Sequence, residues 1–322
     1  MAINTFAEKA VKFLSILDEI YAAQAKTAIL DDAALLPSFI GTNKIKLPKI
    51  SVDGAGNYDR DAGYAQGGVS VNYEEHALQY DRGRKFRIDV IDDDEAAFDL
   101  FRQVTLQYLR TREIPEIDAI RFMEIYNAAT RSGTLGTVVE KDLASSDKPL
   151  ALFDAAEKTL NENEVPEEGR ILFCTNDFYS MLKNTDAISR RIDATSNNGN
   201  INRRVELLDG VTPIIKVPQV RFYSKIKLMD GTTESEKAGG YEAVKAVSRE
   251  SAVVGTKDIN FIYANKAVLR GVIKRNVSKI ISPEQNQSAD AYDVFYRVHH
   301  DLIVKDNETA GIYIHTKATA HA

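Results

Sequence analysis

The sequence predicts an α+β fold, and three observations support this class. Residues 44–52 and 69–80 alternate between apolar and polar side chains, as strands do. Residues 97–129 instead repeat their apolar positions at helical spacing. After residue 134, short helical and strand-like segments follow one another without the steady strand–helix alternation of a parallel sheet.

The charge balance argues against a protein that grips nucleic acid. Of 322 residues, 41 are Lys or Arg and 47 are Asp or Glu, which gives a net charge of −6. A DNA-binding domain usually shows a basic surface, and this composition gives no sign of one.

Composition also predicts a protein made in the cytoplasm, without disulfides and without membrane contact. No apolar run approaches the ~20 residues that span a membrane. Residues 1–13 lack the apolar core of a signal peptide. The single cysteine, Cys174, excludes an internal disulfide framework.

Residues 1–43 are predicted to form an N-terminal arm. Thr5 and Glu8 make a capping box, and apolar residues recur at helical spacing from Phe6 to Tyr21. An irregular segment, 27–42, follows this helix. The helix either packs on its own chain or docks on a neighbour, and the sequence leaves both interpretations open.

Residues 44–91 are predicted to form a long, charged β-hairpin with a further strand-like run at 85–90. Pro48 removes a hydrogen-bond donor from the first strand, which is therefore an edge strand or a bulged one. The connection GNYDRDAGYAQGG, 56–68, is much longer than an ordinary hairpin loop of about two to five residues. The strands carry few apolar residues, and at ~3.3 Å per residue they reach roughly 30 Å from any core. Such a hairpin needs another surface to lie on, because isolated two-stranded ribbons are only marginally stable.

Two helices are predicted between residues 92 and 133. Acids at 92–95 precede the first helix, 97–112, and arginines end it, which suits the helix dipole. Pro115 is placed to open a second helix, 115–129. Polar residues recur there at every third position from Asp118, and nearly all others are apolar, so we expect burial on most sides.

The rest of the chain is predicted to mix short helices with buried strands. Helices are expected over 149–160 and after an N-cap at Thr175 or Asn176. Polar loops are expected at 193–202 and 229–240. The expected strands are 170–174, 211–217, 259–268, 268–281, 294–304 and 311–316.

No catalytic residue, cofactor site or metal site is predicted. Phosphate-binding loops, nucleophile elbows, zinc-protease motifs and paired CxxC motifs are all missing from the sequence. His299 and His300 are neighbours on a predicted strand and point to opposite faces, so they do not ligate one ion. The acids at 92–95 are more typical of a helix start than of a magnesium site. Cys174 follows apolar residues in a predicted strand and is expected to be a small core residue.

The hairpin tip imitates a calcium-binding loop without completing it. Asn57, Asp59 and Asp61 match the first ligand positions of such a loop. Ala62 stands where the loop needs glycine, and Gly68 stands where it needs a bidentate glutamate. We therefore expect no calcium there.

One ordered set of segments points to a known family. A charged strand runs into NYDRDAGYAQGG, then YDRGRKFRIDVIDDDEA, a long helix and IPEIDAIRFMEIYNAA. Later segments are GRILFCTNDFYSMLKNT, VTPIIKVPQVRFY, INFIYANKAVLRGVIK and DVFYRVHHDLIVKDNETAGIYIHTKA. In this order they resemble the major capsid proteins of tailed bacteriophages, the Hong Kong 97 type of fold. The resemblance covers roughly residues 40–317 and depends on ordered patterns rather than on one signature.

This resemblance implies a capsid fold of five segments. They are an N-terminal arm (1–43), an extended loop formed by the β-hairpin (44–91), a peripheral domain with a long spine helix (92–133), an axial domain (134–282), and a return to the peripheral domain with the C-terminal strands (283–322). In that family the extended loop lies across a neighbouring subunit, and axial domains meet at the five-fold and six-fold centres of the shell.

The resemblance also implies a function. The chain would assemble with itself as hexamers and pentamers into an icosahedral shell that encloses double-stranded DNA without binding it specifically. Portal and scaffolding proteins are the implied partners, and the implied location is the virion, after synthesis in the host bacterial cytoplasm. The predicted intersubunit contacts are Tyr58, Asp59, Arg60, Tyr64, Arg82 and Arg84.

Two other functions stay open at this point. A bacterial nanocompartment shell of the encapsulin kind shares the fold and stores enzyme cargo instead of DNA. An unrelated α+β enzyme is the second alternative, although the missing catalytic motifs count against it.

Overall fold

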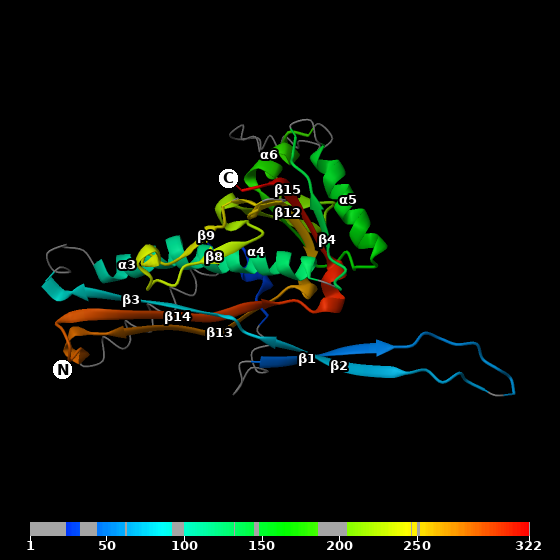
Figure 1. Ribbon diagram of the computed structural model, residues 1–322, viewed down its shortest axis with the longest axis horizontal. Helices are drawn as coiled ribbons and strands as arrows, with labels where there is room; N and C mark the ends of the chain where they lie inside the picture. Colours follow the sequence, from blue (N-terminus) through cyan, green and yellow to red (C-terminus); the bar gives the residue numbers. More distant parts are fainter. Residues whose placement is uncertain are drawn as a thin grey trace, which may run out of the picture.

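A long helix and two β-sheets form the body of the molecule, and a β-hairpin projects from it (Figure 1). The computed structural model describes residues 24–32, 44–61, 63–91, 100–131, 133–144, 148–185, 205–245, 247–249 and 252–321. In Figure 1 a three-stranded sheet lies beneath the long helix, and a six-stranded sheet lies above the C-terminal half of that helix. This mixture of helices and sheets confirms the predicted α+β class.

The two hairpin strands are confirmed at the predicted positions. β1 (Lys44–Val52) pairs antiparallel with β2 (Val69–Ala77) along its whole length. The further run forms β3 (Tyr80–Asp89), which pairs with β14 (Ala291–Ile303), and β14 pairs with β13 (Arg270–Ile281). The residues predicted to form one extended loop thus divide between the projecting hairpin and the three-stranded sheet of the body.

One continuous helical run replaces the two predicted helices. α3 (Leu100–Tyr108) continues through a π-helical turn, η3 (Leu109–Glu113), into α4 (Ile114–Thr130). The prediction that Pro115 begins a new helix is therefore wrong. Proline lacks an N–H and its ring crowds the carbonyl four residues earlier, so it normally breaks a helix interior. Here the Ile114 N–H donates to the Leu109 carbonyl five residues back, and this wider turn accommodates the proline.

α4 is buried on most of its circumference, as predicted, and it joins the two sheets. Its N-terminal part packs on the three-stranded sheet, where Ile117 shares a cluster with Tyr296. Its C-terminal part packs on the six-stranded sheet, where the Phe122 ring meets the Phe173 ring edge-on at 5.3 Å between centroids. Both sheets therefore depend on one helix for their relative position.

Two polar residues of α4 lie inside the body as well. Asp118 and Arg121 are fully buried. The Asp118 carboxylate accepts hydrogen bonds from the backbone N–H groups of Lys26 and Thr27, each at 3.0 Å. Arg121 donates to the Thr27 carbonyl at 3.1 Å and pairs with Asp31. Buried charges need such partners, and these contacts hold the N-terminal segment against α4.

The six-stranded sheet has the strand order β4–β15–β12–β5–β7–β6. Its strands are β4 (Thr137–Glu140), β5 (Arg170–Thr175), β6 (Leu207–Leu208), β7 (Thr212–Val217), β12 (Lys257–Asn265) and β15 (Ile312–Ala320). α5 (Pro149–Glu162) and α6 (Asn176–Lys183) cover the face opposite α4. Of the two predicted caps, Thr175 is the one used, because its hydroxyl accepts the Phe178 N–H at 3.3 Å.

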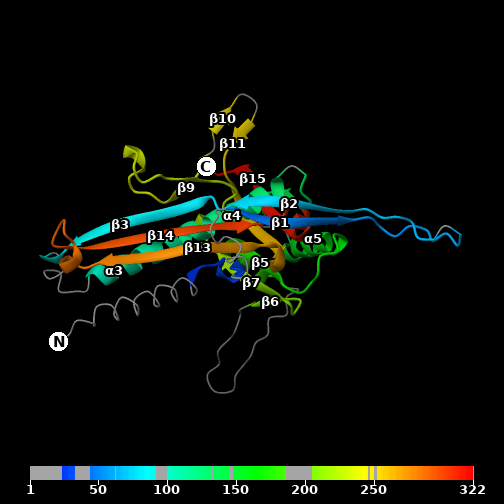
Figure 2. The same ribbon diagram turned by 90° about the horizontal axis from the view of Figure 1, so that it is seen from below.

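Short elements complete the chain. They are β8 (Ile226–Leu228), β9 (Tyr241–Ala243), β10 (Val247–Arg249), β11 (Ala252–Val254), and the 3-10 turns η1 (Ala28–Leu30), η4 (Gln219–Arg221), η5 (Glu234–Glu236), η6 (Lys266–Val268), η7 (Pro283–Gln285) and η8 (Asp306–Gly311). The polar segment 229–240 connects β8 to β9 and contains η5. Figure 2 shows the β10–β11 ribbon standing away from the body.

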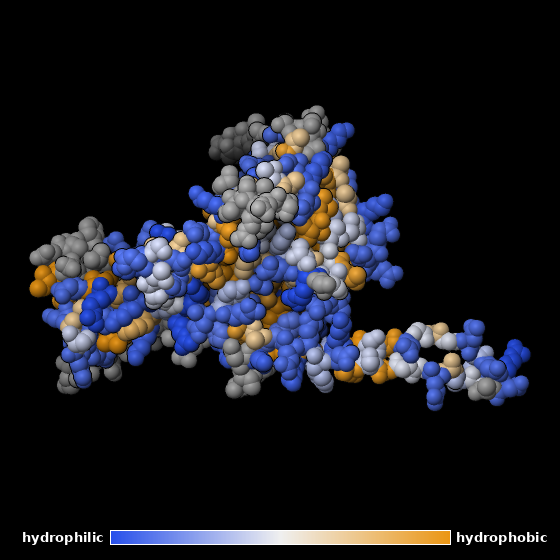
Figure 3. All heavy atoms as spheres, in the orientation of Figure 1, coloured by the Kyte–Doolittle hydropathy of each residue, from blue (hydrophilic) through white to orange (hydrophobic). Residues whose placement is uncertain are grey.

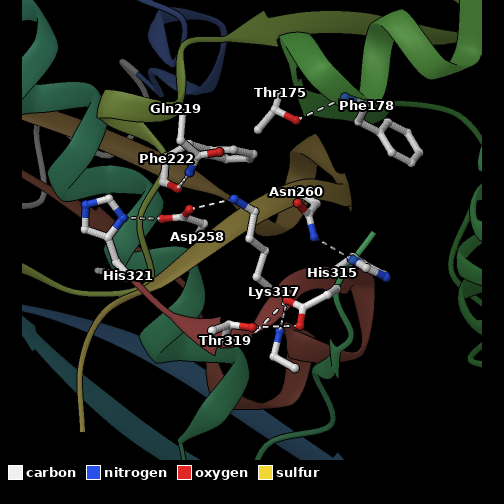
Figure 4. A network of polar contacts seen from close by, with 12 residues as sticks. Thr175, Phe178, Gln219, Phe222, Asp258, Asn260, His315, Lys317, Thr319 and His321 are labelled. Carbon is white, nitrogen blue, oxygen red and sulfur yellow. Dashed lines mark hydrogen bonds and ion pairs between the residues drawn. The ribbon is translucent and has the colours of Figure 1, made fainter. Parts of the chain in front are cut away.

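Polar side chains add to the backbone ladder between β12 and the C-terminal strand β15 (Figure 4). The Asp258 carboxylate lies 2.8 Å from the Lys317 Nζ and 2.9 Å from the His321 Nδ1. Deeper in the sheet, the Asn260 amide lies 3.0 Å from the His315 Nδ1. These residues have a structural role, because the contacts of Lys317 and His315 join the two strands and that of His321 ties the segment directly after β15 to β12.

Several predicted elements lie outside the described residues. They are the N-terminal helix between Thr5 and Tyr21, the acidic run 92–95 and the loop 193–202.

The buried carboxyl group of Glu113, at the end of the π turn, leads to a prediction about pH and stability. Burial raises the pKa of Glu113 well above the ordinary value of 4.5, and the negative charge of Glu116 acts in the same direction. The folded chain therefore binds this proton more tightly than the unfolded chain, and the free energy of unfolding decreases as the pH rises above the ordinary value.

Glu113→Gln keeps the shape of the side chain and removes the charge. We expect the variant to melt at a higher temperature than the native subunit near pH 8, and at about the same temperature near pH 4, where the native carboxyl is already protonated. Thermal melts of the isolated subunit at both pH values test this. A variant that is less stable than the native chain near pH 8 would contradict it.

Candidate assembly surface

The base of the hairpin belongs to the core of its own chain. Ile45 and Leu47 are buried, and they pack with Leu78, Val272 and Ile303. Residues two apart on a strand point to the same face. This contact therefore fixes which face of β1 is turned towards the body.

The outer half of the hairpin carries its apolar side chains on the opposite face. Six residues that pair across the strands form this distal apolar face: Pro48 with Tyr73, Ile50 with Val71, and Val52 with Val69. Directly paired residues share a face, and these alternate with Leu47 and Lys49 along β1. Ile50, Val52 and Val69 are 60%, 66% and 67% exposed, so the described chain leaves this face uncovered.

The exposed position of this face makes it a candidate surface for contact with another molecule. The hairpin projects clear of the body in both ribbon views (Figures 1 and 2). Figure 3 shows apolar side chains gathered on it between the body and the polar tip. Contiguous exposed apolar surface on a soluble chain usually marks an interaction site, and a two-stranded ribbon alone is only marginally stable.

Four of the predicted contact residues meet at the tip. The rings of Tyr58 and Tyr64 lie edge-on with centroids 4.9 Å apart, and the side chains are 60% and 89% exposed. Between them, Asp59 and Gly63 exchange two backbone hydrogen bonds of 3.0 and 2.8 Å, which close a compact turn around Arg60. The positive φ of 84° at Gly63 suits glycine. The tip is thus an ordered turn that displays two aromatic rings.

The other two predicted contact residues lie on β3, in the body. Arg82 donates to Glu116 at 2.6 Å and to the Met229 carbonyl at 2.8 Å. Arg84 donates to the Lys237 carbonyl at 2.9 Å. The structure therefore gives both arginines contacts with the 229–240 loop of their own chain. That they also reach a neighbouring subunit stays a prediction.

The distal apolar face is not evident from the charge content of the hairpin as a whole. Most of the charges lie at the base and near the tip, and the apolar residues lie between them. The signal was available in the alternation of Val69, Val71 and Tyr73, opposite Ile50 and Val52. Only the register between the strands shows that all five side chains share one face.

Cys174 and His300, two residues with side chains that could take part in chemistry, are buried inside the body. Cys174 is fully buried, and burial raises the pKa of its thiol to about 12, so it is no nucleophile near neutral pH. Burial also lowers the pKa of His300 to about 3. Among the described residues, no group of three or more His, Cys, Asp or Glu side chains is placed to hold a metal ion. Within the same residues, no helix is both long and apolar enough to cross a membrane.

Solved structures of phage particles have the same architecture as this chain. "Capsid structure of the Cyanophage P-SCSP1u" matches with a TM-score of 0.62 at 14% identity, over 87% of this chain and 85% of that chain. "Asymmetric unit of bacteriophage PhiM1 mature capsid" matches with a TM-score of 0.57 at 12% identity, over 87% and 83%. "Mycobacterium phage Che8" matches with a TM-score of 0.54 at 13% identity, over 89% of both chains. No protein-family model and no curated protein matches the sequence.

These similarities define the class of structure. The chain has the fold of phage capsid proteins. The resemblance to the major capsid proteins of tailed bacteriophages is therefore confirmed for the fold. At 12% to 14% identity the similarity extends to the fold alone.

Similar substitutions in the two halves of the hairpin should differ in their effect on the stability of the subunit. Leu47→Ala removes a buried side chain from the core, and we expect it to lower the free energy of unfolding of the subunit by about 2–5 kcal/mol. Ile50→Ala, three positions further out, removes an exposed side chain and should change that free energy by less than about 0.5 kcal/mol.

Urea unfolding of the isolated subunits measures both values, and the yield of assembled particles supplies the second measurement. Ile50→Ala should reduce the yield although the subunit is as stable as the native one. If Ile50→Ala destabilises the subunit as much as Leu47→Ala does, the outer half of the hairpin belongs to the core and this account of it is wrong.

Proposed function

We propose that this chain is the major capsid protein of a tailed bacteriophage. Copies of it assemble as hexamers and pentamers into an icosahedral shell that encloses double-stranded DNA. The observation that carries the proposal is the projecting hairpin with its uncovered distal apolar face, in a chain with the phage-capsid fold. An arm that is anchored at its base and exposed along its outer half is suited to lie on the next subunit.

The proposed segments follow the Hong Kong 97 arrangement. An N-terminal arm (1–43) precedes the extended loop, and the peripheral domain contains the spine helix of α3, η3 and α4. The three-stranded sheet packs under that helix, so its strands β3, β13 and β14 belong with it. The axial domain, proposed over 134–282, is built around the six-stranded sheet and its two covering helices. Two strands cross this boundary: β13 lies in the three-stranded sheet, and β15 of the C-terminal part lies in the six-stranded sheet.

The charge of the chain suits a container better than a DNA-binding protein. A net charge of −6 offers few cations to phosphates, and each such contact would hinder packing and release of the genome. We propose that DNA is enclosed without specific binding, that the chain has no catalytic activity and that it uses no cofactor. Portal and scaffolding proteins are its proposed partners, and the virion is its proposed location after synthesis in the host cytoplasm.

Assembly of the purified protein tests the proposal directly. We expect mass photometry and negative-stain microscopy to show hexamers, pentamers or closed shells. Assembly is favoured because a neighbouring subunit removes the distal apolar face from water. The measurement is made over a range of ionic strengths, with and without a scaffolding protein. A stable monomer under all of these conditions would contradict the proposed function.

A further inference from the structure

A pocket of about 300 Å³ lies between β3, the helical run and the 229–240 loop. Its wall includes Arg82, Arg84, Tyr108, Arg112, Glu116 and Asp230. The pocket is open to solvent at Arg112, which is exposed. Its chemistry depends on which of these charges are already paired.

The acids of the pocket wall are committed to other groups. Glu116 pairs with Arg82 at 2.6 Å. The Asp230 carboxylate accepts the N–H groups of Thr232 and Thr233 at 2.8 and 2.9 Å, and the Thr233 hydroxyl at 2.6 Å. Asp81, at the rim, accepts the Arg297 Nε at 2.8 Å. The other two arginines of the wall, Arg84 and Arg112, have no ion pair with these acids.

Arg84 and Arg112 supply the uncommitted donors. Arg84 donates from one end of its guanidinium to the Lys237 carbonyl, and its NH1 lies beside Gly231, where a Cβ would be 2.9 Å away. A glycine at this point leaves the guanidinium room to reach the pocket. Arg112 has no carboxylate partner in the part of the chain that the structure describes. A guanidinium is always charged and presents paired donors that fit an oxyanion.

We infer that this pocket is an anion-binding site that takes a carboxylate from the hairpin tip of a second copy of the chain. The inference rests on the proposed function, since it names the site on a neighbouring subunit where the hairpin tip binds. The tip segment carries three acids, Asp53, Asp59 and Asp61, and one arginine, Arg60. The Asp61 side chain is exposed, so it is available to such a site.

The placement of the two surfaces agrees with this contact. In Figure 1 the hairpin projects to one side of the body, and the β8–β9 connection lies towards the other side. Residues of this connection and of β3 line the pocket. Surfaces on opposite sides of one subunit meet when copies pack head to tail, and such contacts form a ring when the rotation between copies closes. A ring of this kind places the tip of each copy at the pocket of the next one.

A charge exchange tests the contact in assembled particles. Arg112→Glu and Asp61→Arg should each lower the particle yield by about tenfold, because each places like charges together. The double variant restores the attraction with the signs reversed and should recover most of the yield. Arg110→Glu is the matched control, since Arg110 is an exposed arginine on the same helical run outside the pocket.

Two outcomes of this experiment overturn the inference. One is equal loss of yield for Arg110→Glu and Arg112→Glu, which would mean that only the overall charge matters. The other is a double variant that assembles no better than the single variants. Because both are judged against native particles, they leave the proposed function standing, whereas a native chain that never assembles contradicts that function itself.

A binding measurement on the isolated subunit does not depend on assembly. A synthetic peptide of residues 56–68 should bind the native subunit, and its affinity should fall about tenfold for Arg112→Glu and remain unchanged for Arg110→Glu. A short DNA duplex is titrated in parallel. If the duplex binds in an Arg112-dependent manner and the peptide does not, the site takes phosphate and the inference is wrong.

Discussion

The burial of α4 between two sheets is the constraint on which the rest of the structure depends. Phe122 and Ile117 of this helix contribute to two different hydrophobic clusters, one between the helix and each sheet. A helix break at Pro115 would separate Leu109 from Ile117, and both belong to the cluster at the three-stranded sheet. The π turn at Leu109–Glu113 is therefore a local adjustment that keeps one long helix through the body.

The orientation of the hairpin is set by its contact with the body. Ile45 and Leu47 fix its base and its rotation, so its outer half must leave the body with the distal apolar face uncovered. A free subunit gains nothing from this arrangement. It becomes favourable when a second copy removes the apolar side chains from water, at about 25 cal/mol for each Å² covered. The same geometry directs the tip away from the pocket of its own chain.

Much of this architecture could be predicted from sequence. Alternation located both hairpin strands, and β5, β12, β14 and β15 each overlap a predicted strand, because buried strands have a clear pattern in local sequence. Other features depend on distant contacts. The pairing of β3 with β14 joins residues more than 200 positions apart, and the partners of Asp118 lie about 90 positions away. A local sequence pattern does not predict contacts between residues so far apart in the chain.

Some features of the candidate assembly surface could also be predicted from local sequence, and others could not. The tip tyrosines were predicted from their place in a glycine-rich connection, and they do lie together on the projecting hairpin. Arg82 and Arg84 were predicted from charge alone, and charge does not show that the 229–240 loop of the same chain already contacts them. The distal apolar face needed the register of two strands. Local sequence pattern thus predicts which elements are exposed, whereas the pairing of strands determines which side chains share a surface.

Amide hydrogen exchange, compared between free subunits and assembled particles, tests the central claim most directly. Residues 44–47 and 74–77, at the base of the hairpin, should exchange slowly in both states because the core holds them. Residues 48–52 and 69–73 should exchange quickly in the free subunit and at least about tenfold more slowly in particles, where a neighbour covers them. If the outer half exchanges equally fast in both states, the hairpin is not an assembly arm and the account is contradicted.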